Sequence, residues 1–251
     1  MSIKNKVAVI TGAGGGLGQS FAKLLSQEGV LTILCGRTLA SLEETATMCL
    51  PGSTILIVGD VTNRGDMEKL FSQAYQTAGR IDILINCAGL QHPGFWLEQT
   101  AEEWCEVVRV NLFGVELCCR LAIPYMRKNG YGRIINIGSR TAMEAPVGLS
   151  AYATSKAGLF ALTRMLGLET EADTNILIND LIPGVTMSQM SSFGQNPDDV
   201  YPYLRELINL PDGGKSGKSF YKGQIVDLWK REETTFIRKL LRRLSKYIKR
   251  N

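Results

Sequence analysis

The amino-terminal part of the chain places a glycine-rich turn between a predicted strand and a predicted helix. Residues 7–10 (Val-Ala-Val-Ile) form an apolar, β-branched run that is typical of a buried parallel strand. Residues 11–18 follow at once and contain five glycines, and Phe21, Leu24 and Leu25 then mark the apolar face of a helix. This order places a pyrophosphate at the N-terminus of the helix, with backbone N–H groups directed at it. A purely structural turn is the alternative.

Strand-like and helix-like segments alternate through the rest of the chain. Strands are predicted at 30–35, 54–59, 81–85, 134–138 and 176–182, and helices at about 63–78, at 101–129 and around Tyr152. This alternation predicts a doubly wound, mostly parallel α/β sheet with helices on both faces, the Rossmann fold. A length of 251 residues and an apolar content of 45% fit one α/β domain. We predict a single dinucleotide-binding catalytic domain over residues 1–230.

A tyrosine and a lysine stand four residues apart in one of the predicted helices. Tyr152 and Lys156 therefore share a helix face. A free phenol has a pKa of ~10, and a nearby ammonium lowers it by favouring the phenolate. The pair thus has the chemistry of a general acid/base. A solvated helix face is the alternative reading of such a pair.

Three polar residues lie where a ligand crevice is expected. Ser139 and Asn86 each follow an apolar strand, and the carboxyl ends of parallel strands border the crevice of such sheets. Asn111 falls inside the predicted helix 101–129, although asparagine competes with the helix backbone for hydrogen bonds. A functional or kinking role is expected there, and a satisfied structural amide stays open.

These motifs together resemble the single-domain short-chain dehydrogenase/reductase family. The similarity runs in register from Lys6 to about Met190. The matching elements are T-G-x-x-x-G-x-G at 11–18, Asp60-Val61, Asn86-Cys87-Ala88-Gly89, Asn111, Ser139, Tyr152 with Lys156, and Pro183-Gly184 followed by Ser188. The chain departs from the family at Cys87, where the family has a second asparagine, and at Ser188, where it has threonine.

The resemblance implies a mechanism and a cofactor site. Tyr152 would exchange a proton with a carbonyl or alcohol oxygen, and Ser139 would hold that oxygen. Lys156 would lower the pKa of the tyrosine and bind the nicotinamide ribose, and Asn111 would hold a relay water. The expected cofactor-binding residues are Gly12, Gly16, Leu17, Gly18, Arg37, Asp60, Val61, Asn86, Ala88, Gly89, Tyr152, Lys156, Pro183, Gly184, Val185 and Ser188.

The end of the second predicted strand indicates which dinucleotide binds. NAD-specific enzymes place a carboxylate there, whereas this chain has Gly36 followed by Arg37. A guanidinium suits a 2′-phosphate in charge and in geometry. We therefore predict an NADP(H)-dependent oxidoreductase that interconverts a ketone and a secondary alcohol. Gly15 replaces the second basic residue of many NADP-dependent relatives, so an NAD(H)-preferring dehydrogenase stays open. So does a non-catalytic dinucleotide-binding regulatory protein.

Cysteine and histidine usage argues against a metal site. The six cysteines have no metal-ligand spacing, and His92 is the single histidine. No metal is expected, and free cysteines fit a reducing compartment, so a cytoplasmic location is expected. No apolar run is long enough to span a bilayer. The expected partner is a small-molecule carbonyl or alcohol substrate.

The rim of the expected pocket is less well specified. Arg140 could bind an acidic substrate group or pair with a nearby glutamate. A group of apolar residues could form a lid or could serve packing alone: Phe95, Trp96, Met187, Met190 and Phe193.

The carboxyl-terminal part contains a predicted helix, a strand and a basic tail. A helix is predicted from Asn196 to about Leu210, and a last strand at 218–228. Residues 236–251 hold seven basic residues and no acid, with apolar residues at helical spacing. We predict a basic amphipathic helix appended over 231–251. Docking on the body, and contact of residues 234–251 with a membrane surface or an acidic partner, stay open; nucleic acid is not expected. A homo-oligomer also stays open.

Overall fold

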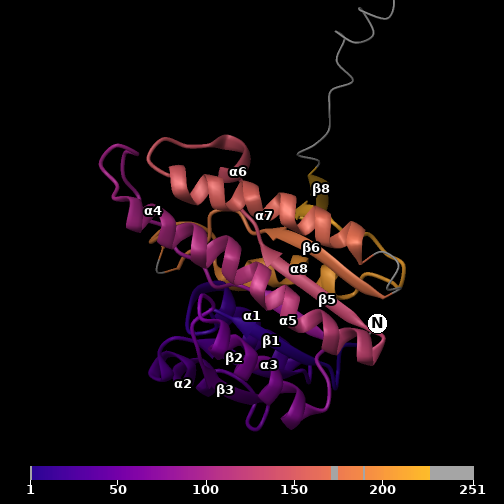
Figure 1. The fold of residues 1–251 in the computed structure, drawn as a ribbon. Coiled ribbons are helices and arrows are strands. Elements are labelled where there is room, and N and C mark those ends of the chain that lie inside the picture. The colour runs from indigo at the N-terminus through magenta and orange to yellow at the C-terminus, as the bar shows by residue number, and fades with distance from the viewer. Residues whose placement is uncertain (1, 171–174, 189, 227–251) are drawn as a thin grey trace, which may run out of the picture.

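The computed structural model describes residues 2–170, 175–188 and 190–226. The predicted tail helix at 231–251 lies outside these residues. Within them the strands form one eight-stranded sheet in the order β3-β2-β1-β4-β5-β6-β7-β8 (Figure 1). All neighbouring pairs are parallel except β7 with β8. The strands are β1 Val7–Thr11, β2 Leu31–Gly36, β3 Thr54–Val58, β4 Ile83–Asn86, β5 Gly132–Ile137, β6 Ile176–Ile182, β7 Lys218–Tyr221 and β8 Gln224–Val226.

Helices cover both faces of the sheet, which confirms the predicted doubly wound fold. One apolar cluster joins the sheet to α3 Arg64–Ala78, α5 Gly114–Asn129 and α7 Ser150–Glu169. A second cluster joins the other face to α1 Gly16–Gln27, α2 Leu39–Thr47 and α8 Tyr201–Ile208. Along β1, Val7 and Val9 enter the first cluster, and Ala8 and Ile10 enter the second. This is why a central parallel strand reads as a continuous apolar run.

The predicted helix at 101–129 is not one regular helix. It consists of α4 Ala101–Val108, a π-helix at Arg109–Phe113 and α5. Asn111 lies within the π-helix and is fully buried. A π-helical turn accommodates one extra residue relative to α-helical hydrogen bonding, and such turns are frequent at functional sites. The interruption agrees with the kinking role expected for Asn111.

The segment after β6 matches the prediction in one element and differs in another. The predicted helix is present as a 3-10 turn at Pro197–Val200 followed by α8, and the Asn196 side chain accepts a hydrogen bond from the Asp198 N–H as its cap. The single strand predicted at 218–228 is wrong, because β7 and β8 form a hairpin. Lys222 and Gly223 have φ values of 49° and 74°, and two left-handed residues close a tight hairpin turn.

Candidate active site

The predicted site residues gather along one edge of the sheet. Because β1 to β6 run parallel, the segments that follow them leave at the same edge. The α7 pair Tyr152 and Lys156 and the π-helix residue Asn111 complete the set. The expected residues at the strand ends are Gly12, Gly16, Leu17 and Gly18 after β1, Arg37 after β2, Asp60 and Val61 after β3, Asn86, Ala88 and Gly89 at β4, Ser139 after β5, and Pro183, Gly184, Val185 and Ser188 after β6.

The glycine-rich turn packs closely against the segment that follows β4. Gly12 has a φ of 64°, and a Cβ built on it would lie 2.7 Å from backbone atoms of Ala88. The Ala88 N–H donates to the Thr11 hydroxyl at 3.3 Å. Gly16 faces the segment after β6, since a Cβ there would lie 3.1 Å from the Cβ of Ser188. Three segments that are distant in sequence therefore meet around the start of α1.

The residues around this turn fit a dinucleotide. The first turn of α1 contains no acidic residue, so the positive end of the helix is not neutralised. Gly15 precedes it with extended backbone (φ 178°) and no side chain to cover the helix N-terminus. At the end of β4, Asn86 Oδ1 is buried and has no hydrogen-bond partner within the described part of the chain. A helix N-terminus without an acidic side chain fits the anionic diphosphate of such a ligand, and the unpaired Asn86 Oδ1 leaves one acceptor for a donor group.

Ser139 is held by Thr141 and interacts with Tyr152. The Ser139 Oγ accepts from the Thr141 N–H at 3.2 Å and from the Thr141 hydroxyl at 2.8 Å. A hydroxyl has two acceptor positions and one proton, so the remaining proton is available to a third group. Ser139 hydrogen-bonds the Tyr152 phenol, and this contact lowers the pKa of Tyr152.

The net pKa direction of Tyr152 differs from the expectation. Burial raises the pKa of Tyr152, and this effect is larger than the lowering by Ser139. The Lys156 ammonium lies 5.5 Å from the centroid of the tyrosine ring and donates to the Ile137 carbonyl at 2.8 Å. The expected lowering below the ordinary phenol value is therefore wrong for this structure. The physical reason is that burial destabilises the phenolate by more than the hydrogen bond from Ser139 stabilises it.

Asn111 connects the segment after β4 to the helix that carries Tyr152. Its Oδ1 accepts from the Leu90 N–H at 2.7 Å, and its Nδ2 donates to the Leu90 carbonyl at 2.8 Å. The same Nδ2 donates to the Ser155 hydroxyl at 3.0 Å. Both side-chain N–H groups of Asn111 are bonded within the protein, so this amide has no N–H left to donate to the expected relay water.

Replacement of Asn111 by alanine should destabilise the fold. The change leaves both backbone groups of Leu90 without their partner, and each such loss costs about 1–3 kcal/mol. We expect the free energy of unfolding to fall by about 2–4 kcal/mol, measured by urea denaturation. Asn129→Ala is the matched control because its Nδ2 makes one long contact to the Ile81 carbonyl, at 3.5 Å. Equal losses in the two variants would show that another group holds Leu90.

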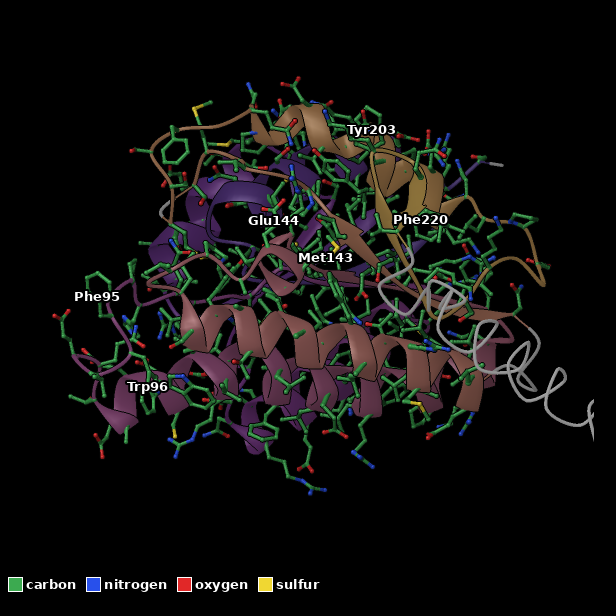
Figure 2. The ribbon with its side chains drawn as sticks, turned by 90° about the horizontal axis from the view of Figure 1, so that it is seen from above. Phe95, Trp96, Met143, Glu144, Tyr203 and Phe220 are labelled. Atoms are coloured by element: carbon green, nitrogen blue, oxygen red, sulfur yellow. The ribbon has the colours of Figure 1, made fainter. Side chains whose placement is uncertain are left out.

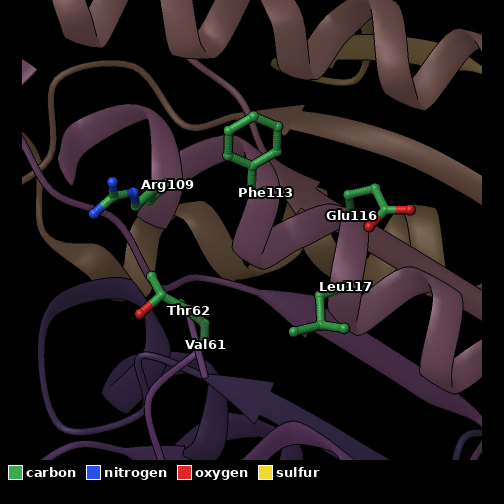
Figure 3. Close-up of a pocket in the computed structure, with 6 residues that line it drawn as sticks. All are labelled: Val61, Thr62, Arg109, Phe113, Glu116 and Leu117. Atoms are coloured by element: carbon green, nitrogen blue, oxygen red, sulfur yellow. The ribbon is translucent and has the colours of Figure 1, made fainter. Parts of the chain in front are cut away.

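The adenine-side residues lie at the ends of β2 and β3. Gly59 N–H bonds the Gly36 carbonyl, so Arg37 and Asp60 follow neighbouring strand ends. Arg37 is exposed, and Asp60 Oδ1 accepts from the N–H and the hydroxyl of Thr62, both at 2.8 Å. A pocket of about 230 Å³ adjoins this region (Figure 3). Its lining consists of Val61, Thr62, Arg109, Phe113, Glu116 and Leu117, so it does not include the Ser139–Tyr152 pair.

Arg140 and the apolar residues of the expected pocket rim differ in their surroundings. Arg140 forms an ion pair with Glu144 one helical turn later, which is the glutamate alternative. The apolar residues are exposed, with 62% for Phe95 and 66% for Trp96, so they do not serve core packing. Figure 2 shows these two side chains at the periphery, with Met143 and Glu144 nearer the middle of the view. Gln91 donates to the Met190 carbonyl at 2.9 Å and so links the two rim loops.

Asp180 is a buried ionisable residue that the sequence pattern did not single out. Asp180 lies within β6, in the run Ile-Leu-Ile-Asn-Asp-Leu-Ile, and is fully buried. An acid inside an apolar strand is itself a signal, because a buried carboxylate requires partners. Within the described residues no group of histidine, cysteine and acidic side chains could hold a metal ion, and no helix could cross a membrane.

Comparison with known proteins identifies the family. Residues 6–197 match the short chain dehydrogenase family, so the chain belongs to it. An uncharacterized oxidoreductase of Staphylococcus aureus is 33% identical over 198 residues, covering 78% of this chain and 84% of that protein. A 3-oxoacyl-[acyl-carrier-protein] reductase of Thermotoga maritima is 31% identical over 241 residues, covering 94% and 95%.

Solved structures agree with the assignment. The crystal structure of a 3-ketoacyl-(acyl-carrier-protein) reductase from Brucella melitensis, complexed with NADH, superimposes with a TM-score of 0.82. It is 25% identical and covers 87% of this chain and 97% of its own. The protein is thus an oxidoreductase of the short-chain dehydrogenase/reductase family, whose members bind a nicotinamide dinucleotide.

Proposed function

We propose that the protein is an NADP(H)-dependent oxidoreductase that interconverts a ketone and a secondary alcohol, with Tyr152 as the general acid/base. One observation carries the proposal. The Tyr152 phenol is hydrogen-bonded by Ser139 and stands on the same helix face as the buried Lys156, at the sheet edge where the glycine-rich turn lies. Proton exchange and a dinucleotide cradle are thus combined at one place.

The side chains divide the work of ketone reduction. The dinucleotide, when bound, supplies the hydride that the carbonyl carbon accepts. Ser139 donates a hydrogen bond to the carbonyl oxygen and orients it. Tyr152 gives its proton to that oxygen as the negative charge develops, and Lys156 stabilises the resulting phenolate by its charge. In alcohol oxidation Tyr152 takes the proton back.

The raised pKa of Tyr152 keeps the phenol protonated near neutral pH, which is the form that ketone reduction requires. A phenol whose pKa lies above 10 is protonated at pH 7 and can act as a proton donor without prior titration. Alcohol oxidation requires the phenolate, so its rate should rise with pH through the alkaline range. The pH dependence of the two directions therefore reports on the same proton.

A substrate panel tests the proposal directly. Ketones, secondary alcohols and a 3-oxoacyl thioester are offered to the protein, and NADPH consumption or formation is followed by absorbance. The thioester is included because two relatives carry the name of 3-oxoacyl reductases. Turnover of any of them supports an enzyme. NADPH binding without turnover across the panel would favour the regulatory alternative.

Arg37 should set the preference between the two dinucleotides. Gly36 offers no carboxylate to a ribose 2′-hydroxyl, whereas the exposed Arg37 guanidinium can bind a 2′-phosphate. We expect Arg37→Ser to lower kcat/KM for NADPH about 10- to 100-fold, because a hydrogen bond to a charged group contributes about 1.5–3 kcal/mol. The kcat/KM for NADH should change by less than about twofold, because NADH has no 2′-phosphate for Arg37 to bind.

The control for Arg37 is another exposed arginine. Arg64 pairs with Glu68 on α3, and Arg64→Ser should leave both cofactors unaffected. A clear preference of the unmodified protein for NADH would refute the NADP(H) assignment. The NADH in the Brucella melitensis complex is the observation that favours that alternative.

A further inference from the structure

Asp180 is a buried carboxylate without an ion pair among the described residues. It lies in the interior of β6 with no exposed surface. Its two oxygens accept from neutral hydroxyls, Oδ1 from Thr163 at 2.6 Å and Oδ2 from Ser219 at 2.8 Å. Two neutral donors compensate only part of the cost of burying a negative charge. If the carboxyl is ionised, a nearby cation is therefore needed to stabilise it.

A directional chain of hydrogen bonds ends on this carboxylate. Asn86 Nδ2 donates to Asn136 Oδ1 at 2.8 Å, and Asn136 Nδ2 donates to the Thr163 hydroxyl at 2.9 Å. Because Thr163 accepts from Asn136, its own proton is directed to Asp180. The chain starts at Asn86, whose Oδ1 has no hydrogen-bond partner among the described residues, and runs from β4 through β5 to β6. Its polarity stabilises Asp180 in the ionised form.

Lys156 is the cation whose charge acts on Asp180. Burial lowers the pKa of Lys156 to about 8, and the charge of Asp180 opposes that shift. Burial raises the pKa of Asp180 to about 7, and the charge of Lys156 opposes that shift in turn. The geometry agrees, because Lys156 Nζ donates to the Ile137 carbonyl at 2.8 Å, and Ile137 pairs in the sheet with Leu181, the neighbour of Asp180. Thr163, which bonds Asp180, lies on the same face of α7 two turns after Lys156.

The other titratable groups near this pair carry no charge at neutral pH. Cys87, after β4, interacts with Lys156, and Cys119, on α5, interacts with Asp180. Burial raises the pKa of both thiols, so both stay protonated. Tyr152 faces Lys156 from the same helix and is protonated as well. Asp180 is therefore the anion that can keep the buried ammonium charged.

We propose that Asp180 is a positioning residue that holds Lys156 in its protonated form, and thereby sets the pH range in which Tyr152 works. The inference rests on the proposed function for its catalytic meaning. Asp180 acts through Lys156 and does not itself contact substrate or cofactor. The competing view is that Asp180 merely accepts hydrogen bonds from Thr163 and Ser219.

A double-mutant cycle separates these views without any substrate. Asp180→Asn keeps the shape and an acceptor but removes the charge, and Lys156→Met removes the ammonium. Urea unfolding is measured for the four proteins at pH 8 and at pH 5. At pH 8 we expect a coupling of about tenfold or more in the unfolding equilibrium constant, which equals ~1.4 kcal/mol. At pH 5, where the carboxyl is protonated, the coupling should fall below about twofold.

The sign of one effect is diagnostic. In the Lys156→Met background, Asp180→Asn should stabilise the protein at pH 8, because it removes a buried carboxylate that has lost its counter-charge. In the unmodified background the same change should destabilise it. Additive effects at both pH values would overturn the proposal, since hydrogen-bond acceptance alone does not depend on Lys156.

Asp82 supplies the matched control. It is also fully buried, but Arg80 binds it through two hydrogen bonds of 2.7 and 2.6 Å. Lys6 approaches it at 3.6 Å. The Asp82→Asn and Lys156→Met changes should therefore be additive. Coupling as large as that of Asp180 would show that Lys156→Met disturbs buried carboxylates in general.

The pH profile of turnover is the second arm and needs only single variants. In Asp180→Asn, Lys156 loses its proton at lower pH, so the positive charge that the proposed mechanism places beside Tyr152 is lost earlier as the pH rises. The alkaline limb of ketone reduction should therefore move down by about one pH unit or more, which corresponds to ~1.4 kcal/mol. A lower rate with an unmoved limb would overturn the proposal. If the unmodified protein turns over no substrate, the proposed function fails, and the unfolding cycle still decides the charge coupling.

Discussion

Replacing Tyr152 with phenylalanine should lower kcat by about 10³-fold while the Kd for NADPH changes less than about twofold, because a positioned general acid contributes about 10²- to 10⁴-fold. Phenylalanine keeps the ring and its packing, but it lacks the O–H group that Ser139 hydrogen-bonds in the unmodified protein. Steady-state kinetics gives kcat, and quenching of protein fluorescence gives the Kd. The separation of the two readouts distinguishes lost chemistry from lost binding.

The control for this variant is a tyrosine outside the site. Tyr203 lies on α8, on the face of the sheet opposite α7 (Figure 2). Tyr203→Phe should leave kcat unchanged. Retention of turnover in Tyr152→Phe would rule out Tyr152 as the proton donor and with it the proposed mechanism.

Replacing Gly12 with alanine should weaken both the fold and the binding of NADPH. The left-handed backbone at φ 64° costs an alanine about 1–2 kcal/mol. Overlap of the new Cβ with the Ala88 backbone at 2.7 Å adds about 1–3 kcal/mol, because backbone cannot rotate away as a side chain can. We expect a loss of about 2–5 kcal/mol in the free energy of unfolding. Displacement of the turn should also raise the Kd for NADPH by at least about tenfold.

Replacement of Gly52 separates the cost of left-handed backbone strain from the cost of steric overlap. Gly52 has a similar φ of 75°, but a Cβ built on it meets no atom within 4 Å. Gly52→Ala should therefore cost only the backbone term of about 1–2 kcal/mol and leave the Kd for NADPH unchanged. A Gly12 variant that matched the Gly52 variant in both readouts would show that the turn need not lie so close to Ala88.

Much of the fold could be predicted because local pattern and burial agree in a parallel sheet. Residues 176–182 form β6 with the predicted bounds, since each residue of that strand is buried. The grouping of Ser139, Asn86 and the glycine-rich turn also followed from pattern alone. Parallel strands place their carboxyl ends at one edge, so residues that follow different strands must meet there.

The hairpin and the π-helix were harder to predict because each depends on a short local deviation. Lys222 adopts a left-handed conformation that its residue type does not favour, and the pairing of β7 with β8 stabilises it. The π-helix at Asn111 accompanies hydrogen bonds to Leu90, a residue of another segment. Neither feature has a period that a sequence pattern could reveal.

The order of residues along the chain was enough to specify the doubly wound sheet, the glycine-rich turn and the positions of Ser139, Tyr152 and Lys156, because hydrophobic period and motif spacing are local properties. The electrostatics of the site needed the folded arrangement. The upward pKa direction of Tyr152 and the mutual influence of Asp180 and Lys156 arise from burial and from charges brought together across β6 and α7. Such energies depend on distance and desolvation in space, and separation along the chain carries no information about either.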